Sequence, residues 1–180
     1  GALNYYDDAS RGDVAIVVRD YESRTGPARV CINKFRRTSG SPVHGVKSLN
    51  YLENIIARRE ARLNGYDEAV FLNERGEIAE GTASNIFWVR KDTLYTPSVE
   101  CGILPGIIRK MLIDSVDALG LGVEEGGYYP ESITGSRFAF LTNSLSGPVL
   151  ISQLGDAEFP LDDGLYETIK KLLLTGLGWV

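Results

Sequence analysis

The sequence has few of the residues that build metal centres and disulfide frameworks. Its 180 residues contain two cysteines, Cys31 and Cys101, and a single histidine, His44. The cysteines have no CxxC spacing, so no disulfide scaffold is predicted, and they are expected to behave as small hydrophobic residues. A zinc site built on one histidine would need unusual ligands. The sequence therefore predicts a metal-free protein.

Positive charge and long apolar runs are also scarce. Lys and Arg number 19 against 24 Asp and Glu, which gives a formal net charge of -5 and no electrostatic support for binding nucleic acid or an anionic membrane. No apolar run approaches the roughly 20 residues that span a bilayer. The first residues, GALNYYDDAS, have neither the basic nor the apolar region of a signal peptide. These absences predict a cytoplasmic protein without a membrane or nucleic-acid partner.

What is present is the pattern of one globular domain. Hydrophobic residues make up 43% and charged residues 24% of the chain, and no repeat or linker divides residues 1–180. Alternating and apolar runs predict strands, longer periodic segments predict helices, and the fold class is α/β (α+β) with a mixed, mostly antiparallel sheet and packed helices. The expected strands are 13–21, 28–37, 68–73, 85–91, 93–97, 122–127 (a short one), 137–143 and 148–154, and the expected helices are 49–64, 106–119 and 165–176.

The helix at 49–64 has the clearest periodicity. Its apolar positions recur at helical spacing, and its basic residues are predicted to form a solvated face. Ser48 or Asn50 is a candidate N-cap, and Gly65 has the position of a C-terminal glycine. The apolar set is Leu49, Leu52, Ile55, Ile56 and Leu63; the basic set is Arg58, Arg59 and Arg62.

A lysine stands just before this helix in apolar company. In VHGVKSLNYLENIIARREA, residues 43–61, Lys47 follows Val43 and Val46 and precedes Leu49. Such a lysine either packs its stem along a surface with its head in water, or is kept neutral for chemistry. On these residues alone the first interpretation is the default.

Three loops carry polar groups that suit a bound ligand. Residues 80–85 (EGTASN) join an acid to small polar residues, and residues 142–146 (TNSLS) add hydroxyls after an apolar strand. Gly106 and the free N–H groups of Ile107 and Ile108 at a helix start suit an anion. A lysine, a carboxylate and such an anion site are together what an aldehyde cofactor with a pyridine ring and a phosphate needs, although each alone is weak.

Taken in order, these segments resemble a known family. KSLNYLENIIARREARLNGYDEAVFLNERGEIAEGTASNIFWV, LYTP, ILPGIIR and FLTNS, within residues 41–156, are similar to the class IV aminotransferases, the fold type IV pyridoxal-phosphate enzymes. The resemblance implies pyridoxal 5'-phosphate as cofactor. It assigns Lys47 to the internal aldimine and to proton transfer, and Glu80 to the pyridine nitrogen. The other implied contacts are Tyr51 at the phenolic oxygen, Thr82 and Ala83 beside the ring, backbone N–H groups of Ile107 and Ile108 at the phosphate, and Asn143 and Ser144 in a second phosphate-side loop.

The resemblance also implies departures and partners. The family usually has threonine where this chain has Ile108, so a hydroxyl on the phosphate is lost. Family members usually have a smaller N-terminal domain before this one and are commonly homodimers. Residues 1–180 therefore resemble the large cofactor-binding domain, with the small domain absent.

The reaction is less sharply indicated than the cofactor. SPVHGVKSLNYLEN, DEAVFLNERGEIAEG and LTNSLSG are most similar to the 4-amino-4-deoxychorismate lyases, which eliminate pyruvate from aminodeoxychorismate and leave p-aminobenzoate. The four-residue step from Lys47 to Tyr51 suits the lyases or the D-amino-acid aminotransferases better than the branched-chain ones. An aminotransferase acting on branched-chain or D-amino acids is the alternative. A non-catalytic domain that serves as an interaction surface is the second alternative.

Several residues near these motifs are given plainer interpretations. Asn85 is expected to tie its loop to backbone, and His44 is expected to be an ordinary loop residue. Arg36 and Arg37 are expected to be a solvated pair at a strand end, although one of them could meet a substrate carboxylate.

Overall fold

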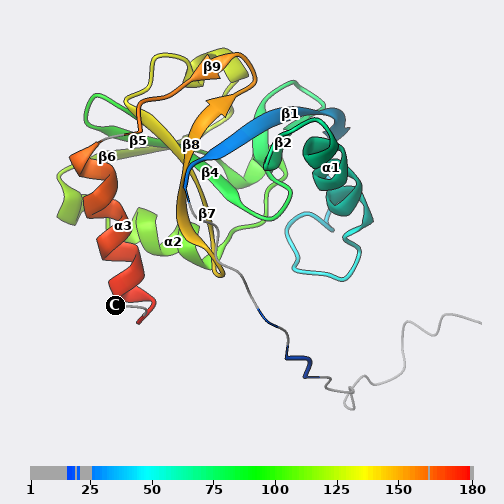
Figure 1. Cartoon of the computed structure of the whole chain (residues 1–180), viewed down its shortest axis with the longest axis horizontal. Coiled ribbons are helices and arrows are strands. Elements are labelled where there is room, and N and C mark those ends of the chain that lie inside the picture. Colours follow the sequence, from blue (N-terminus) through cyan, green and yellow to red (C-terminus); the bar gives the residue numbers. More distant parts are fainter. Residues whose placement is uncertain (1–15, 19, 21–25, 162, 179–180) are drawn as a thin grey trace, which may run out of the picture.

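The computed structural model describes residues 16–18, 20, 26–161 and 163–178 (Figure 1). Of the strand expected at 13–21, residues 16–18 and 20 have no regular secondary structure, and the remaining positions lie outside the described residues. The other strands and all three expected helices are found, with shifted ends.

Nine strands of the described chain form one mixed sheet. The order is β3-β2-β1-β8-β7-β4-β5-β6, with β9 paired to β8. Five of the pairings are antiparallel and three are parallel, which confirms the mixed, mostly antiparallel sheet. The strands are β1 (Ala28–Arg37), β2 (Glu68–Asn73), β3 (Ile78–Gly81), β4 (Asn85–Arg90), β5 (Thr93–Pro97), β6 (Gly122–Gly126), β7 (Phe138–Asn143), β8 (Gly147–Leu154) and β9 (Ala157–Glu158).

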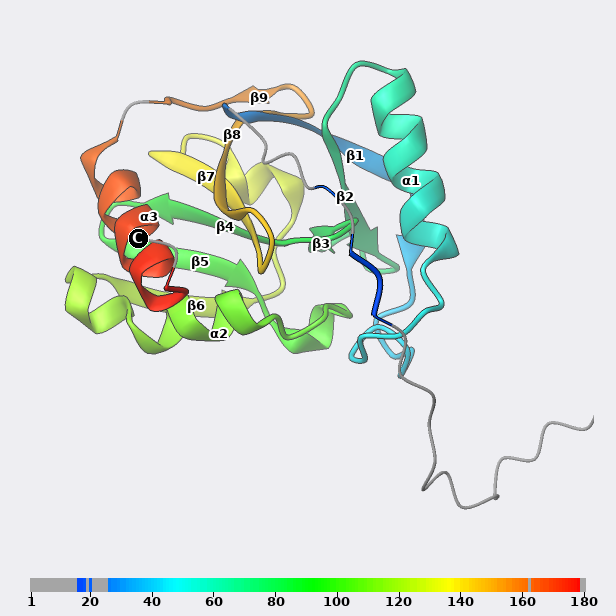
Figure 2. The same cartoon turned by 60° about the horizontal axis from the view of Figure 1, so that its bottom comes forward.

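The sheet curls so that its two ends approach each other. The backbone N–H of Ile78 in β3 donates to the carbonyl of Tyr128, just after β6, over 2.6 Å. Near the middle of the order, β1 lies between β2 and β8 and is parallel to both. This curl brings together strand ends and loops from segments that are distant in the sequence (Figure 2).

Three α-helices in the described part of the chain lie against the sheet, at two separate places. The first, α1 (Leu52–Leu63), lies beside β1 and β2, whereas α2 (Ile107–Asp114) and α3 (Gly164–Gly176) lie together at the other side (Figures 1 and 2). The helix expected at 106–119 is shorter than predicted, because α2 ends at Asp114 and a 3₁₀ turn, η2 (Val116–Leu119), continues to Gly120. Two further 3₁₀ turns are η1 (Val99–Cys101) and η3 (Pro130–Ile133).

The core has two main parts. One fills the inside of the curled sheet and includes Val30, Ile86 and Trp88. The other lies between the sheet and the α2–α3 pair and includes Leu112 and Ile169. Burial of these apolar side chains is the main force that fixes the sheet's curvature.

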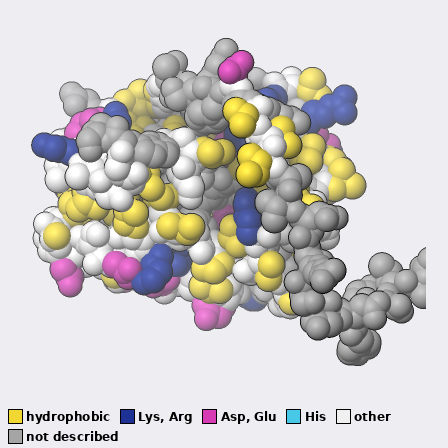
Figure 3. Space-filling model, turned by 90° about the horizontal axis from the view of Figure 1, so that it is seen from below, with side chains coloured by type: hydrophobic (Ala, Val, Ile, Leu, Met, Phe, Trp, Pro, Cys, Tyr) yellow, Lys and Arg dark blue, Asp and Glu magenta, His cyan; other side chains and the backbone are white. Residues whose placement is uncertain are grey.

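Helix α1 differs most from its predicted environment. It buries Ala57 and Ala61, whereas the apolar stripe is exposed, with Leu52 at 64% and Ile55 at 58%. No side chain caps its start, so neither Ser48 nor Asn50 is the N-cap. Gly65 does end it as predicted: its φ is +78°, and the N–H groups of Gly65 and Tyr66 donate to Arg62 and Ala61 as in a Schellman motif. Seen from below, apolar side chains are exposed on both sides of the molecule, including the side where α1 lies (Figure 3).

None of the described helices is long and apolar enough to cross a bilayer. The described residues also contain no cluster of three or more His, Cys, Asp or Glu side chains placed to hold a metal ion.

Candidate active site

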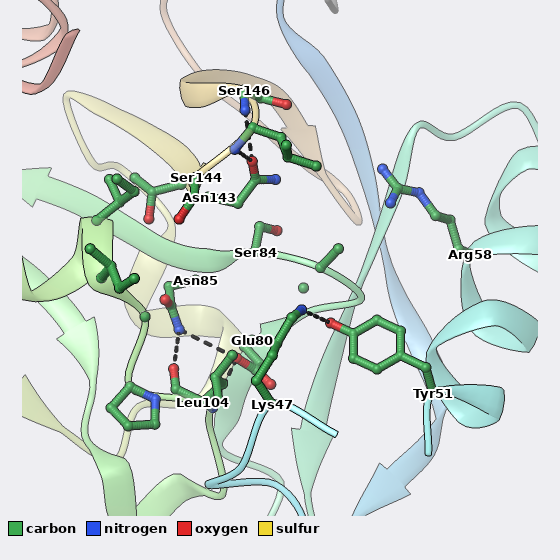
Figure 4. Close-up of a pocket in the computed structure, with 18 residues that line it drawn as sticks. Lys47, Tyr51, Arg58, Glu80, Ser84, Asn85, Leu104, Asn143, Ser144 and Ser146 are labelled. Atoms are coloured by element: carbon green, nitrogen blue, oxygen red, sulfur yellow. Dashed lines mark hydrogen bonds between the residues drawn. The ribbon is translucent and has the colours of Figure 1, made fainter. Parts of the chain in front are cut away.

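A cavity of about 480 Å³ opens where the ends of β3, β4 and β7 meet α1 and α2 (Figure 4). Eight of the nine residues predicted for the site line it: Lys47, Tyr51, Glu80, Ala83, Ile107, Ile108, Asn143 and Ser144. The other lining residues are Arg58, Gly81, Ser84, Asn85, Leu104, Pro105, Gly106, Thr142, Leu145 and Ser146. Segments up to about a hundred residues apart in sequence thus share one cavity.

Lys47 and Tyr51 form a pair on one wall. The Nζ of Lys47 donates to the hydroxyl of Tyr51 over 3.1 Å and lies 4.6 Å from the centroid of the tyrosine ring. Lys47 is exposed, and so are Val46 and Leu49, so the apolar residues next to Lys47 in the sequence do not enclose it. Tyr51, rather than an aliphatic pocket, holds the amine at the cavity (Figure 4).

Glu80 is the acidic residue of the cavity wall, and it is 7% exposed. One carboxylate oxygen accepts from the guanidinium of Arg37, and the other accepts from the N–H of Leu104 over 3.1 Å and the amide of Asn85 over 3.3 Å. Burial raises the pKa of Glu80 to about 7, and the charge and hydrogen bond of Arg37 oppose that rise. A carboxylate has about four lone-pair sites, so Glu80 keeps room to accept one more N–H donor.

Arg37 was expected to be solvated and is instead buried. Its side chain is 2% exposed, pairs with Glu80 and lies with its guanidinium 4.2 Å from the centroid of the Phe71 ring. The expectation failed because it rested on strand-end position alone. Arg37 is the charge partner of Glu80.

The start of α2 faces the cavity, and its N-cap is Gly106, with φ of −66°. Gly106 has no side chain to cap the helix, and among the described residues no other side chain is seen to accept from the first turn's N–H groups. A Cβ on Gly106 would lie 2.3 Å from the Oδ1 of Asn85, so the close approach requires glycine. Asn85 donates to the carbonyl of Leu104 over 2.8 Å, which confirms its predicted role in tying the loop to backbone. Ile108 turns its side chain into the core while its backbone begins the helix.

The turn between β7 and β8 forms another part of the cavity wall. The Oδ1 of Asn143 accepts from the N–H groups of Leu145 and Ser146 over 2.9 and 2.8 Å, so its side chain shapes the turn. Ser144 is exposed at the cavity. Of the predicted pair, Ser144 therefore has its side chain available to a ligand, whereas the side chain of Asn143 maintains the shape of the turn.

Thr82 does not line the cavity. It is buried, and its hydroxyl donates to the carboxylate of Glu68. Its neighbours Gly81, Ala83 and Ser84 do line the cavity. Thr82 thus fixes the loop that presents these neighbours.

Arg58 lines the cavity as well, although it was predicted to lie on a solvated helix face with Arg59 and Arg62. Its guanidinium reaches from α1 toward the cavity (Figure 4). The nearest charge is Glu68, at 3.7 Å from the Nη2 of Arg58.

These features agree with comparisons to known proteins. The chain belongs to the amino-transferase class IV family, whose model matches residues 1–154. The chain is 32% identical over 138 residues to an aminodeoxychorismate lyase of Bacillus subtilis, which covers 77% of this chain and 47% of that protein.

Solved structures give the same family. A putative 4-amino-4-deoxychorismate lyase from Legionella pneumophila superposes with a TM-score of 0.83 at 34% identity, covering 87% of this chain and 59% of that one. A branched-chain amino acid aminotransferase from Thermobaculum terrenum, in its PLP form, has a TM-score of 0.79 at 30% identity, covering 86% of this chain and 52% of that one. The fold is therefore that of the fold type IV aminotransferases. The matches cover 47% of the B. subtilis protein and as little as 27% of other curated relatives, so the chain spans half of their length or less.

The cofactor of this family is pyridoxal phosphate. The residues present fit it: a lysine amine, a buried carboxylate with a remaining acceptor site and an uncapped helix start share one cavity. A cavity of about 480 Å³ falls in the size range of small-molecule sites.

Proposed function

We propose that the chain is the cofactor-binding part of a pyridoxal-phosphate enzyme that acts on a small amine substrate, with Lys47 as the reactive amine. The observation that carries this proposal is the convergence of Lys47, Glu80 and the uncapped start of α2 on one cavity. When bound, the cofactor supplies an electron sink for charge that develops on the substrate's α-carbon.

Residues of the chain itself would transfer the proton, orient the reactive amine and hold the cofactor. The Nζ of Lys47 removes the α-proton and returns it, a role worth roughly 10²- to 10⁴-fold in rate. Tyr51 orients that amine through the hydroxyl contact of 3.1 Å. Glu80 would accept an N–H from the cofactor's ring nitrogen, and Arg37 holds that carboxylate in place by donating to it. The N–H groups at Ile107 and Ile108, with Ser144, would hold the phosphate.

For the reaction, we propose 4-amino-4-deoxychorismate lyase activity, in which pyruvate leaves and p-aminobenzoate remains. The names of the B. subtilis and L. pneumophila proteins favour it, and the four-residue step from Lys47 to Tyr51 favours it over a branched-chain aminotransferase but not over a D-amino-acid one. The second candidate is an aminotransferase for branched-chain or D-amino acids. It is favoured by a probable branched-chain-amino-acid aminotransferase of Rickettsia felis, 35% identical over 125 residues.

The cofactor proposal is tested by intact mass and peptide mapping after incubation with pyridoxal phosphate and borohydride. One reduced cofactor on Lys47 is expected, none in Lys47→Ala, and an unchanged adduct in the control Lys171→Ala, because Lys171 is exposed on α3. A folded chain that takes up no cofactor would instead favour the interaction-surface alternative. Release of pyruvate from aminodeoxychorismate separates the lyase from a transaminase, which would convert 2-oxoglutarate to glutamate.

We further propose that the chain pairs with a second copy through the exposed apolar face of α1. That face presents Leu52, Ile55, Ile56 and Leu63, which would otherwise lie open to water. Light scattering should give a dimer mass for the wild type and a monomer for Leu52→Glu/Ile55→Glu. Leu161→Glu, exposed outside α1, is the control and should leave the mass unchanged. A monomeric wild type at micromolar concentration would contradict this proposal.

A further inference from the structure

Arg58 is, with Lys47, one of two basic residues among the described residues that line the cavity. Its side chain is 41% exposed and extends from α1, and it lies across the cavity from Leu104 and Asn85 (Figure 4). Its neighbours Arg59 and Arg62 on the same helix are exposed and do not line the cavity. Of these three arginines, Arg58 alone is placed to meet a bound molecule.

The guanidinium of Arg58 lies near the negative charge of Glu68 but does not donate a hydrogen bond to it. The Nη2 lies 3.7 Å from the Oε2 of Glu68, which is beyond hydrogen-bond distance. The other oxygen of Glu68 already accepts from the N–H groups of Ala69 and Thr82 and from the Thr82 hydroxyl. The Nε of Arg58 is buried and has no hydrogen-bond partner among the described residues. Donors of Arg58 therefore remain available to an anion.

Two buried hydroxyls lie on the same side of the cavity. Ser84 and Thr142 are 7% and 2% exposed, and within the part of the chain that the structure describes, the side-chain oxygen of each is buried without a partner. Both residues and Arg58 also line an adjoining hollow of about 40 Å³. Buried polar groups are normally hydrogen-bonded, so three unpartnered groups in one place indicate a polar ligand.

We propose that Arg58, Ser84 and Thr142 form a subsite for a carboxylate of the amine substrate. This inference rests on the proposed function, which assigns the cofactor's phosphate to the start of α2 and to Ser144. An anion at Arg58 is then a group of the substrate. Guanidinium binds carboxylate through paired, charge-assisted hydrogen bonds, and the two hydroxyls can donate to the same oxygens.

The test uses benzoate and benzamide, which have nearly the same shape and differ in charge. Calorimetric titrations are made on the full chain at low salt, with and without pyridoxal phosphate. Wild type should bind benzoate more tightly than benzamide. Arg58→Gln should weaken benzoate binding about tenfold and leave benzamide binding unchanged. The matched control Arg59→Gln removes the same charge one residue away on the exposed surface and should behave as wild type.

Three results would overturn the subsite. Wild type would show no preference for benzoate, or Arg58→Gln and Arg59→Gln would weaken benzoate binding equally. In the third result, Arg58→Gln would leave benzoate binding intact and weaken the binding of pyridoxal phosphate but not of pyridoxal. That outcome would place the cofactor's phosphate, rather than a substrate carboxylate, at Arg58. Should Arg58→Gln fail to fold, Ser84→Ala serves instead, with an expected loss of about threefold for benzoate alone; unchanged benzoate binding there would also refute the subsite.

The mass of the Lys47 adduct keeps the two proposals apart. If borohydride fixes no cofactor on Lys47 but the benzoate preference depends on Arg58, the anion subsite stands and the cofactor proposal fails. If the adduct forms and Arg58→Gln has no effect on benzoate, the cofactor proposal stands and the subsite fails.

Discussion

Replacing Arg37 tests how much the buried ion pair between Arg37 and Glu80 contributes to the free energy of unfolding. In Arg37→Met, the side chain keeps much of its apolar stem but loses the charge that pairs with Glu80. The two side chains are 2% and 9% exposed, so the pair has little contact with water. Removing one partner of such a buried pair typically costs about 3–5 kcal/mol, because the other charge is left without compensation. The variant also loses the stacking of the guanidinium over Phe71.

The cost of this substitution should depend on pH. Burial raises the pKa of Glu80 from 4.5 to about 7 in the folded protein. Below about pH 4.5 the carboxyl is neutral in both the folded and unfolded states, so there is no ion pair to lose. As the pH rises through 7, the folded wild type must deprotonate Glu80, and Arg37 makes that less costly. Without Arg37 the pKa rises further, so the free-energy difference between variant and wild type grows with pH.

Urea unfolding at pH 5 and pH 8 measures this difference. We expect Arg37→Met to lose about 3–5 kcal/mol at pH 8 and clearly less at pH 5. Arg36→Gln is the matched control, since Arg36 is the exposed neighbour on the same strand, and it should stay within about 0.5 kcal/mol of wild type. A loss in Arg37→Met that is the same at both pH values, or no larger than in Arg36→Gln, would refute the reasoning.

Three further predictions concern two loops at the cavity and the start of α3. Gly106→Ala puts a Cβ 2.3 Å from the Oδ1 of Asn85, so thermal unfolding should show a loss of about 1–3 kcal/mol; Gly164→Ala, which meets nothing within 4 Å, should be neutral or slightly stabilising. Asn143→Ala removes the acceptor of two N–H groups in the β7–β8 turn, and a spectroscopic titration should show about tenfold weaker binding of pyridoxal phosphate; unaltered affinity would mean that the turn keeps its shape without Asn143. Asp163→Ala removes the N-cap of α3, which accepts from Leu165 over 2.8 Å, and calorimetric melting should show a loss of about 1–2 kcal/mol with cofactor affinity retained.

Local sequence patterns predicted most of the secondary structure. The strands at 28–37, 68–73 and 148–154 and the hairpin across Lys91 and Asp92 follow from apolar runs bounded by turn residues. The motif order also predicted eight of the residues that line the cavity. These successes share one property: each depends on residues that are close in sequence or on a resemblance in order.

The role of Arg37 could not be read from its strand. Side chains alternate along β1 from Ala28 to Val30, and that alternation would turn Arg36 inward. The alternation ends after Val30, because Ile32 is exposed and the later buried positions are Asn33 and Arg37. The register with β2 is also irregular between Ile32 and Arg36, and such irregularities are not visible in the sequence. Its partner Glu80 is 43 residues away, and no local pattern connects the two.

The surroundings of Arg58 and of the apolar stripe of α1 also could not be predicted from the sequence. Periodicity separates the two faces of a helix, but it does not say which face the sheet covers. Here small residues, Ala57 and Ala61, approach the sheet, and the larger apolar residues face outward. The position of Arg58 between these faces, with Glu68 of β2 beside it, depends on how α1 lies against the strand.

The parallel placement of β1 between β2 and β8 has a consequence for how the protein reaches its native state. The side chains of Arg29 and Gln153 that meet across β1 and β8 are 124 residues apart. Such long-range pairing is slow to form, because the intervening chain must lose its freedom before the contact contributes stability. Arg37 and Glu80 depend on the strands next to this pairing. We therefore expect the carboxylate at the cavity to be among the last features to become ordered during refolding, and ligands that bind there to slow unfolding more than they speed folding.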